Sequence, residues 1–243
     1  MFLDHYNNTQ YVINPNTPTS ITTTSPSTIC DRTIIRTANI NTIINDPSYP
    51  DQLFVSVGGF FEASNISYDN FINTTLDLSC SSNIKLYVNS LNIIEPGQCT
   101  ITFTLTDLNN NTFTNAQFFT FPLSITSDVI VVPIVQNISP PYVDFSKIKK
   151  INMVVVGSVF NLTCEKFEIE SVFIKVIQPQ FCNNGKIIIK NNGIPGYVYR
   201  LTTPNGTTLQ NTTGVFYVNQ GGYYIYNTNC KIFVNYGLSC AYK

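Results

Sequence analysis

The segment CTITFTLTD, residues 99–107, alternates polar and apolar side chains without interruption. Ile101, Phe103 and Leu105 fall on one face, and the intervening threonines fall on the other. A period of two residues is that of a β-strand with one buried face. No window of the sequence shows the 3.6-residue period of an amphipathic helix, so the sequence predicts an all-β fold.

Further short strands are expected along the chain, and turn sequences separate them. The clearest are LFVSVGGFF, NIKLYVNS, VIVVPIV, KINMVVVG, CEKFEIESVFIKV and GKIIIK. LNNNT after residue 107, NNG at 191–193 and TPNG at 203–206 are turn sequences. The glycines between residues 185 and 222 lie at strand reversals, whereas a phosphate-binding loop needs a following helix. Many short strands at regular spacing predict a sandwich or barrel.

The sequence divides into three parts. Residues 1–29 end in the Ser/Thr/Pro-rich stretch TPTSITTTSPSTI, which has little to bury and is expected to be a flexible tail or stalk remnant. Residues 30–174 are expected to form a first β-domain and residues 175–243 a smaller second one. A chain of 243 residues is long enough for both.

Charged residues make up 11% of the chain, against about 25% in an average soluble protein. A surface solvated by Asn, Thr and Ser suits a secreted or cell-surface protein, although an AT-rich genome would give the same bias. The net charge is −1, and the densest basic cluster is Lys147, Lys149 and Lys150. Nucleic-acid binding needs a larger basic face, so no nucleic-acid partner is expected.

Seven cysteines occur, and none forms a C-x-x-C pair. The single histidine is His5, so a zinc site is not expected. The cysteines favour a disulfide framework in an oxidising compartment. The alternative is a set of buried thiols in a cytosolic protein.

The first residues, MFLDHYNNTQ, lack the charged and apolar regions of a signal peptide. No apolar run approaches the length of a membrane span. We therefore expect an extracellular chain that lacks its native start and is a fragment of a longer one. The candidate glycosylation sites, whose number is close to what chance gives, are Asn65, Asn73, Asn110, Asn137, Asn161, Asn205 and Asn211.

Residues 182–234 resemble the small Ig-like repeats of SprB type found in large adhesins. The shared features are Cys182, Gly185-Lys186-Ile187, the GIPGYVY stretch at 193–199, the GGYY stretch at 221–224 and Cys230. The chain departs from that pattern by inserting Gly196 and by carrying Asn229 where an acidic residue is usual. The resemblance implies a small Ig-like β-sandwich.

Residues from about 50 to 172 resemble galactose-binding-like jelly-roll domains. The matching stretches are LFVSVGGFFEA, YVDFSKIKKINMVVVG and NLTCEKFEIES. The resemblance implies an antiparallel jelly-roll sandwich, and it does not carry a ligand with it. Domains of this kind often hold a structural calcium, for which Asp46, Asp51 and Asp69 are the candidates, although no D-x-D-x-D spacing is present. Paired modules of this composition also resemble adhesion-type surface proteins of social amoebae.

These resemblances imply pairings among the cysteines, although sequence alone does not fix connectivity. The Ig-like repeats pair the cysteines that match Cys182 and Cys230. A jelly roll would bring Cys30 and Cys164 together, and Cys80 and Cys99 flank an expected hairpin. Cys240 is then left over.

Catalysis is not expected, because Ser-His-Asp and Cys-His chemistry needs a histidine inside the fold and His5 lies in the tail. The acidic residues are too scattered to indicate the carboxylate pair of a glycosidase. We expect a non-catalytic adhesion or recognition protein with a cell-surface protein or glycan as partner; the alternative is a carbohydrate-binding module. Candidate ligand contacts are Phe60, Phe61, Tyr68 and Tyr142, although packing in the core is the favoured explanation for these aromatic residues.

Overall fold

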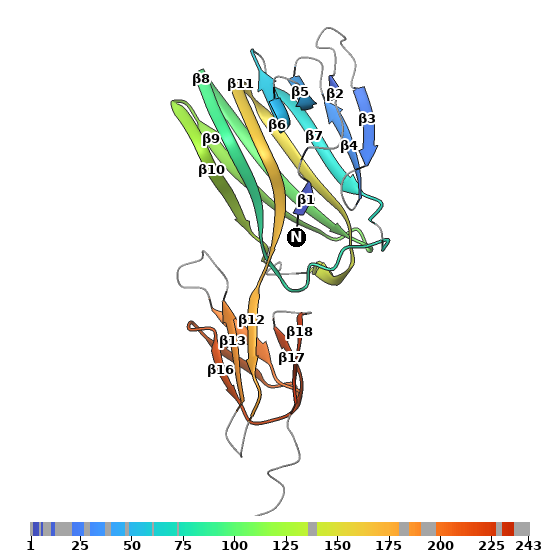
Figure 1. The fold of residues 1–243 in the computed structure, drawn as a ribbon, viewed down its shortest axis with the longest axis vertical. Coiled ribbons are helices and arrows are strands. Elements are labelled where there is room, and N and C mark those ends of the chain that lie inside the picture. The colour runs from blue at the N-terminus through green and yellow to red at the C-terminus, as the bar shows by residue number, and fades with distance from the viewer. Residues whose placement is uncertain are drawn as a thin grey trace, which may run out of the picture. The chain divides into compact units, whose positions relative to one another are not determined.

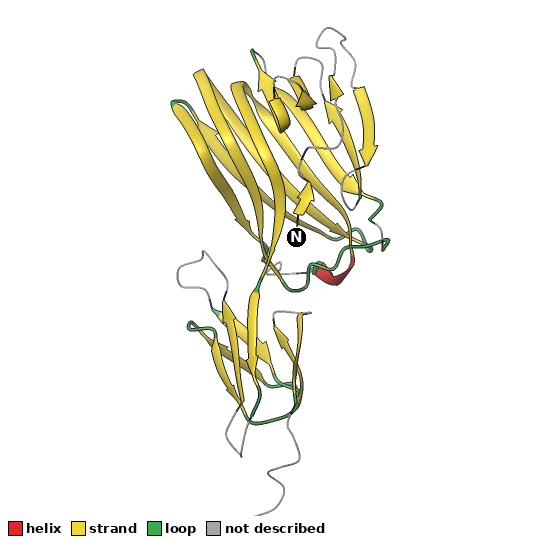
Figure 2. Cartoon of the chain, in the orientation of Figure 1, coloured by secondary structure: helices red, strands yellow, loops and turns green. Residues whose placement is uncertain are grey.

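The computed structural model describes residues 2–4, 6, 11–12, 21–26, 30–36, 40–46, 49–59, 61–71, 73–135, 140–179, 185–190, 198–226 and 230–235. Strands dominate this part of the chain, and a short 3-10 helix, η1 (Phe145–Lys147), is drawn red in Figure 2. No helix found there has the length and hydrophobicity needed to cross a bilayer. The predicted all-β antiparallel fold class is confirmed.

The chain divides into two compact units. Unit 1 comprises Met1–Leu76 and Asn83–Glu170, and unit 2 comprises Asp77–Ser82 and Ser171–Lys243. The short excursion of residues 77–82 into unit 2 has no counterpart in the sequence-based division at residue 174.

Unit 1 contains an 11-stranded antiparallel sheet. Its strands are β1 (Phe2–Asp4), β2 (Tyr11–Val12), β3 (Ile21–Pro26), β4 (Asp31–Arg36), β5 (Ile40–Asp46), β6 (Tyr49–Val57), β7 (Glu62–Asp69), β8 (Ser81–Asp107), β9 (Thr112–Thr120), β10 (Leu123–Pro133) and β11 (Ile148–Ser171). β8 and β11 are long and run side by side (Figure 1). Each pairs with one strand along its first part and with another along its second.

The long strands let the sheet form two layers. The first layer contains β3, β4, β7 and β9, together with residues 98–106 of β8 and 151–157 of β11. The second layer contains β2, β5, β6 and β10, together with residues 83–93 of β8 and 160–164 of β11. Rings meet between the layers, since Phe167 lies 5.5 Å from Tyr68 and 5.6 Å from Phe103, centroid to centroid. A buried hydrogen bond from Thr42 Oγ1 to Ser64 Oγ, 2.8 Å long, also joins them. Unit 1 is therefore the expected jelly-roll sandwich.

The predicted face of residues 99–107 is confirmed within β8. Ile101, Phe103 and Leu105 have no exposed surface, and the threonines between them are partly exposed. The strand is longer than predicted, because it joins NIKLYVNS to CTITFTLTD without a hairpin. The turn after Asp107 is also confirmed by a hydrogen bond from Asn110 N to Asp107 O of 3.1 Å.

β8 and β11 lie very close together at a pair of glycines. A Cβ atom on Gly157 would lie 2.1 Å from Gln98 O, and one on Gly97 would lie 2.5 Å from Ser158 O. Two residues from these glycines, Glu95 and Val159 have φ angles of 64° and 48°. Positive φ in the middle of a strand bends it, so both strands turn from one layer into the other at this point.

Part of the expected tail at residues 1–29 belongs to the fold. β1 pairs with β11, β2 with β5, and β3 with β4. Asp4 and Arg32 are buried and form an ion pair, and the Asp4 carboxylate also accepts a hydrogen bond from Tyr6 N at 2.9 Å. Breaking a buried ion pair by removing one partner is costly, so this contact fixes the N-terminal segment in the interior. The Ser/Thr/Pro content of residues 1–29 is a local property, so it could not show that β1 pairs with β11, which lies far along the chain.

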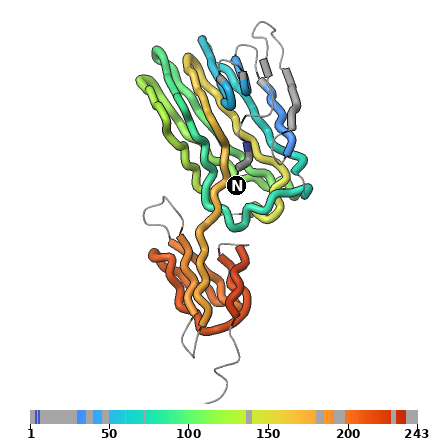
Figure 3. Tube along the Cα trace, viewed as in Figure 1, coloured from blue at the N-terminus to red at the C-terminus, as the bar shows by residue number. Residues whose placement is uncertain are grey.

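Unit 2 is a small β-sandwich. Its strands are β12 (Phe173–Ile177), β13 (Gly185–Lys190), β14 (Tyr199–Thr202), β15 (Thr208–Asn211), β16 (Val215–Val218), β17 (Gly222–Tyr226) and β18 (Cys230–Val234). A three-stranded sheet, β12-β13-β16, faces a four-stranded sheet, β15-β14-β17-β18, and the trace from orange to red in Figure 3 follows both. Ile187 and Phe216 of the first sheet pack in one core with Leu201 and Tyr226 of the second.

The disulfide pairings expected from sequence are wrong. Cys80 is bonded to Cys230, across a sequence separation of 150 residues and within unit 2. Cys99 and Cys164 are buried free thiols, so the pairings of Cys80 with Cys99 and of Cys30 with Cys164 do not occur. Cys182 and Cys240 lie outside the described residues, but the bond from Cys80 excludes a pairing of Cys182 with Cys230.

The geometry of β8 explains the error. The expected hairpin between Cys80 and Cys99 is instead continuous strand, which carries the two residues far beyond the Cα separation of about 7 Å that a disulfide tolerates. Burial raises the pKa of the Cys99 thiol to about 12 and that of Cys164 well above its ordinary value. Both thiols are therefore protonated and unreactive at neutral pH.

Replacing Gly157 by alanine should destabilise unit 1, because the new methyl group would meet the backbone of β8. We expect a loss of about 1–3 kcal/mol in the free energy of unfolding, measured by urea denaturation. Gly58→Ala is the matched control, because nothing lies within 4 Å of its added Cβ. Equal stabilities for the two variants would contradict the close crossing of β8 and β11.

Breaking the Cys80–Cys230 bond should destabilise unit 2 by about 2–5 kcal/mol. Cys80→Ser, Cys230→Ser and the double variant should all show the same loss in thermal unfolding, since each removes the same bond. Peptide mapping of the native chain should recover a linked Cys80–Cys230 pair and no alkylation at Cys99 or Cys164. A peptide that links Cys182 to Cys230 would overturn the assignment.

Candidate functional site

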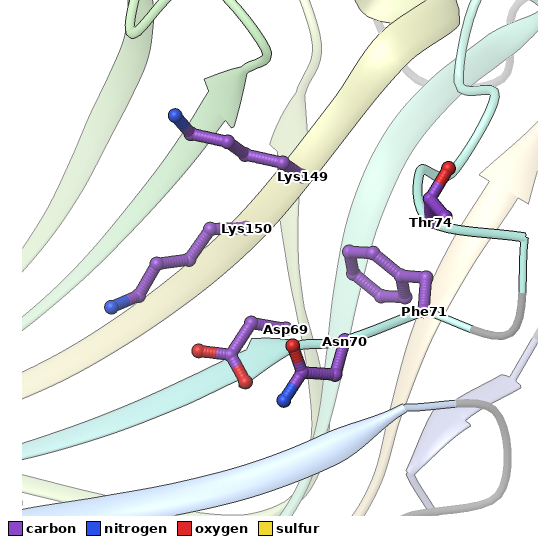
Figure 4. A pocket seen from close by; sticks show the side chains of 6 residues that line it. All are labelled: Asp69, Asn70, Phe71, Thr74, Lys149 and Lys150. Atoms are coloured by element: carbon purple, nitrogen blue, oxygen red, sulfur yellow. The ribbon is translucent and has the colours of Figure 1, made fainter.

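A pocket of about 520 Å³ lies in unit 1 where β7 ends and β11 begins. Its lining residues, shown in Figure 4, are Asp69, Asn70, Phe71, Thr74, Lys149 and Lys150. The volume falls in the range of small-ligand sites. The walls carry both signs of charge, an amide, a hydroxyl and one aromatic ring.

The strand register brings the charged residues together. Tyr68 on β7 is the partner of Ile151 on β11, and both are fully buried. Because alternate residues of a strand face opposite sides, Asp69 and Lys150 turn away from the core on neighbouring strands. Figure 4 shows the two side chains extending in the same direction.

The segment that follows β7 closes the other wall. Asn70 and Thr74 adopt φ angles of 50° and 64°, and the Thr74 amide donates a 2.7 Å hydrogen bond to Phe71 O. Phe71 is 5% exposed, so its ring belongs to the core and does not offer a free face to a ligand.

Asp69 and Lys150 are the uncommitted groups of the pocket. No hydrogen bond or ion pair to another described residue occupies either side chain. By contrast, Lys149 Nζ donates to Asn110 Oδ1 at 2.6 Å, and Asn70 Nδ2 donates to Asp31 Oδ2 at 2.8 Å. The pocket therefore offers one free carboxylate and one free ammonium group, between neighbours that are already held.

The loop after β8 positions the Asn110 side chain that holds Lys149. The buried Asp107 carboxylate accepts hydrogen bonds from the backbone amides of Asn109, Asn111 and Asp144, at 2.8, 2.9 and 2.9 Å. Burial alone would raise the pKa of Asp107, but these bonds, with one from the Asn111 side chain, hold it below its ordinary value. Asp107 is therefore ionised, and its carboxylate orders the loop by accepting these hydrogen bonds.

The ligand contacts expected from sequence lie elsewhere. Tyr68 has no exposed surface, so its ring cannot contact a ligand and the expectation for it is wrong. It is core because β7 directs it towards Phe167. Phe61 and Tyr142 are 55% and 53% exposed but do not line this pocket, and they remain predictions. Phe60 lies outside the described residues.

Sequence reasoning singled out Asp69 for calcium and the lysines as a basic cluster, but it did not bring them together. Only the register of β7 on β11 shows that Asp69 and the lysines are neighbours, and the sequence does not reveal that register. Asn70, Phe71 and Thr74 gave no signal.

The calcium candidates do not gather at one place. Asp51 lies in β6 and Asp69 ends β7, whereas the side chain of Asp46 is outside the described part. Within the described ranges, no three His, Cys, Asp or Glu side chains are grouped as a metal site would require. Structural calcium remains a prediction.

The glycosylation candidates differ in exposure. Asn73, Asn110 and Asn205 are exposed and lie outside strands, where a glycan can be carried. Asn65 and Asn161 lie within β7 and β11, and Asn211 ends β15 with its amide donating to Val215 O. Asn137 is not among the described residues. Glycosylation itself remains a prediction at each of these positions.

Comparison with known proteins gives weak likenesses. No family model matches the chain, and no curated protein matches it. One solved structure with some likeness is the enzymatically active domain of tailspike protein 4 of bacteriophage CBA120, with 11% identity and a TM-score of 0.32 over 64% of this chain and 20% of that one. Another is the agarase AgWH50C, with 9% identity and a TM-score of 0.32 over 72% of this chain and 26% of that one. A third is the family 11 carbohydrate-binding module of the cellulosomal cellulase Lic26A-Cel5E of Clostridium thermocellum, with 11% identity and a TM-score of 0.28 over 67% of this chain and 92% of that one.

The chain spans about a fifth of the tailspike domain and a quarter of the agarase. All of these TM-scores are below 0.5, so neither a fold nor a function is inferred from them.

Asp107 should make stability depend on acid pH. Because its folded-state pKa is lowered, its contribution is present above the ordinary aspartate pKa of about 3.9 and is lost as the pH falls through the lowered value. Asp107→Asn should be less stable at pH 7 and should lose less stability than the native chain on acidification. Thermal unfolding between pH 7 and pH 2 measures this, with the exposed Asp128→Asn as control. Parallel pH curves for Asp107→Asn and the native chain would contradict the role of Asp107.

Proposed function

We propose that the chain is a non-catalytic extracellular recognition protein that binds a glycan, and that the pocket of unit 1 contacts the sugar. The observation that carries the proposal is the pair of uncommitted side chains, Asp69 and Lys150, on neighbouring strands in a pocket of about 520 Å³. At a solvent-exposed surface, leaving two neighbouring groups of opposite charge unpaired costs little free energy, because ion pairs there contribute little to stability. A ligand rich in hydroxyl groups can engage both.

The chemistry of the pocket suits a sugar. Each sugar hydroxyl both donates and accepts hydrogen bonds, and adjacent hydroxyls can use a carboxylate acceptor and an ammonium donor at the same time. Asp69 supplies the acceptor and Lys150 the donor. Thr74 adds a hydroxyl to the wall of the pocket.

The same geometry favours binding over catalysis. Hydrolysis of a glycosidic bond uses two carboxyl groups on either side of the bond. Asp69 is the one carboxylate among the residues that line this pocket, and its neighbour Asp31 accepts the hydrogen bond from Asn70. We therefore propose a binding module and expect no turnover of the bound sugar.

Adhesion through a protein partner is the second candidate, and the strand order of unit 2 favours it. Counted along unit 2, the first, second and fifth strands share one sheet, and the third, fourth, sixth and seventh share the other. Ig-type sandwiches of the constant type separate the first, second and fifth strands from the third, sixth and seventh in the same way, although they place the fourth strand with the first group, and many cell-surface domains use that architecture. This supports the Ig-like reading of unit 2, with a cell-surface protein as the alternative partner.

An extracellular location is part of the proposal. The Cys80–Cys230 bond supports it, because structural disulfides form and persist in oxidising compartments. The exposed Asn73 and Asn110 would then be available for glycosylation.

Asp69→Asn and Lys150→Ala should each weaken glycan binding by about tenfold or more, which corresponds to about 1.4 kcal/mol. The measurement is a glycan array with the intact chain, followed by titration calorimetry with the oligosaccharides that bind. Asp128→Asn and Lys147→Ala are matched controls, because both residues are exposed and neither lines the pocket. Binding that survives both pocket substitutions unchanged would contradict the assignment of the site.

A further inference from the structure

Unit 2 has a pocket of its own, with a volume of about 310 Å³. It lies between the edge strands of the two sheets, β15 on one side and β16 on the other, and the turns next to these strands complete it. The residues that matter for the argument are Thr203, Asn205, Tyr217, Asn219, Gln220 and Tyr224. The volume is at the lower end of small-ligand sites, which suits a single sugar ring.

The polar groups of this pocket are all neutral. Asn205 Oδ1 is held by Thr203 Oγ1 and by the amide of Thr207, 3.2 Å away, which orients the side chain and leaves its Nδ2 available. The side-chain amides of Asn219 and Gln220 have no hydrogen-bond partner among the residues that the structure describes. An amide both donates and accepts, so these three side chains can bind hydroxyl groups without a charge.

Tyr217, which also lines the pocket, has an exposed aromatic ring. Tyr217 on β16 is 68% exposed, although it is part of a strand whose neighbours Phe216 and Val218 are buried. Lys186 Nζ lies 5.3 Å from the centroid of the Tyr217 ring, which stabilises the position of the ring. Because the ring is 68% exposed, the face that Lys186 does not cover offers an apolar surface for the C–H face of a sugar.

Hydrogen bonds hold the turns on either side of the pocket. Tyr224 is 1% exposed and its hydroxyl donates a 2.8 Å hydrogen bond to Gln220 O, which fixes the turn before β17. On the opposite side, the Gly206 amide donates to Thr203 O at 2.9 Å and closes the turn that carries Asn205. The amides and the ring are thus presented by turns that the core of unit 2 already orders, which lowers the entropy cost of binding.

We propose that this pocket is a second glycan site, which binds a neutral sugar between the Tyr217 ring and the amides of Asn205, Asn219 and Gln220. The proposal rests on the glycan-binding function proposed above and adds a second site of different chemistry. The pocket of unit 1 carries Asp69 and two lysines, whereas none of the residues that line this one is charged. The two sites therefore select different sugars.

Two sites on one chain have a functional consequence. A chain that binds one sugar with each unit can join two glycan-bearing surfaces, or bind one such surface with the added strength of a bivalent ligand. Adhesion then follows from glycan binding, and no protein partner is needed.

The test is a glycan array that prints glucose-, galactose-, mannose- and N-acetylglucosamine-terminated neutral glycans beside glucuronate- and sialate-terminated acidic ones. We expect Tyr217→Ala to weaken binding to a set of neutral glycans by about tenfold or more. Tyr217→Phe, which keeps the ring, should retain that binding. Tyr223→Ala is the matched control, because Tyr223 is 61% exposed on β17 and does not line the pocket.

The outcomes separate this site from the one in unit 1. Loss with Tyr217→Ala of glycans that Asp69→Asn still binds supports the second site. If Asp69→Asn loses binding while Tyr217→Ala behaves as Tyr223→Ala does, the second site is overturned and the proposed function stands. If only Tyr217→Ala loses binding, the second site stands and the assignment of the unit 1 pocket fails. A native chain that binds no glycan on the array overturns both.

Discussion

The close contact between β8 and β11 at Gly97 and Gly157 is the constraint on which unit 1 depends. Both strands bend there and pass from one layer of the sandwich to the other. Each layer is then completed by the strands that pair with them. The register of β7 on β11 places the start of β11, which carries Lys149 and Lys150, beside the end of β7. The pocket is thus a consequence of how the core is built, and residues in the core decide which polar groups meet outside it.

Unit 2 depends on a different kind of constraint. Its two sheets enclose a small core, and the Cys80–Cys230 bond attaches the segment 77–82 to β18. Small domains have little apolar surface to bury, and a covalent cross-link compensates for this. Both candidate sites then follow one plan, since each presents polar side chains at strand ends or turns that a buried core has already ordered.

Sequence reasoning succeeded where the signal was local. Alternation in residues 99–107 correctly predicted the buried face of Ile101, Phe103 and Leu105. Continued through the expected strand CEKFEIESVFIKV, the same alternation predicts that Phe167, Ile169 and Phe173 share one face, yet Phe173 is 52% exposed. The chain leaves unit 1 at Glu170, Val172 is buried in the core of unit 2, and the alternation reverses. The disulfide framework was expected, but the pairing of Cys80 with Cys230 was missed, as were the Asp4–Arg32 ion pair and the pockets. Each joins residues that are distant in sequence, and no local pattern reports such pairs.

The central claim is that the chain binds sugars at preformed pockets without altering them. Native mass spectrometry of the intact chain, incubated with an oligosaccharide selected on a glycan array, tests this most directly. The account predicts a complex whose mass is that of the chain plus the unmodified oligosaccharide, and no shorter products after prolonged incubation. Release of shorter sugars would show catalysis, and the absence of any complex would show that the pockets do not bind glycans; either result would contradict the account.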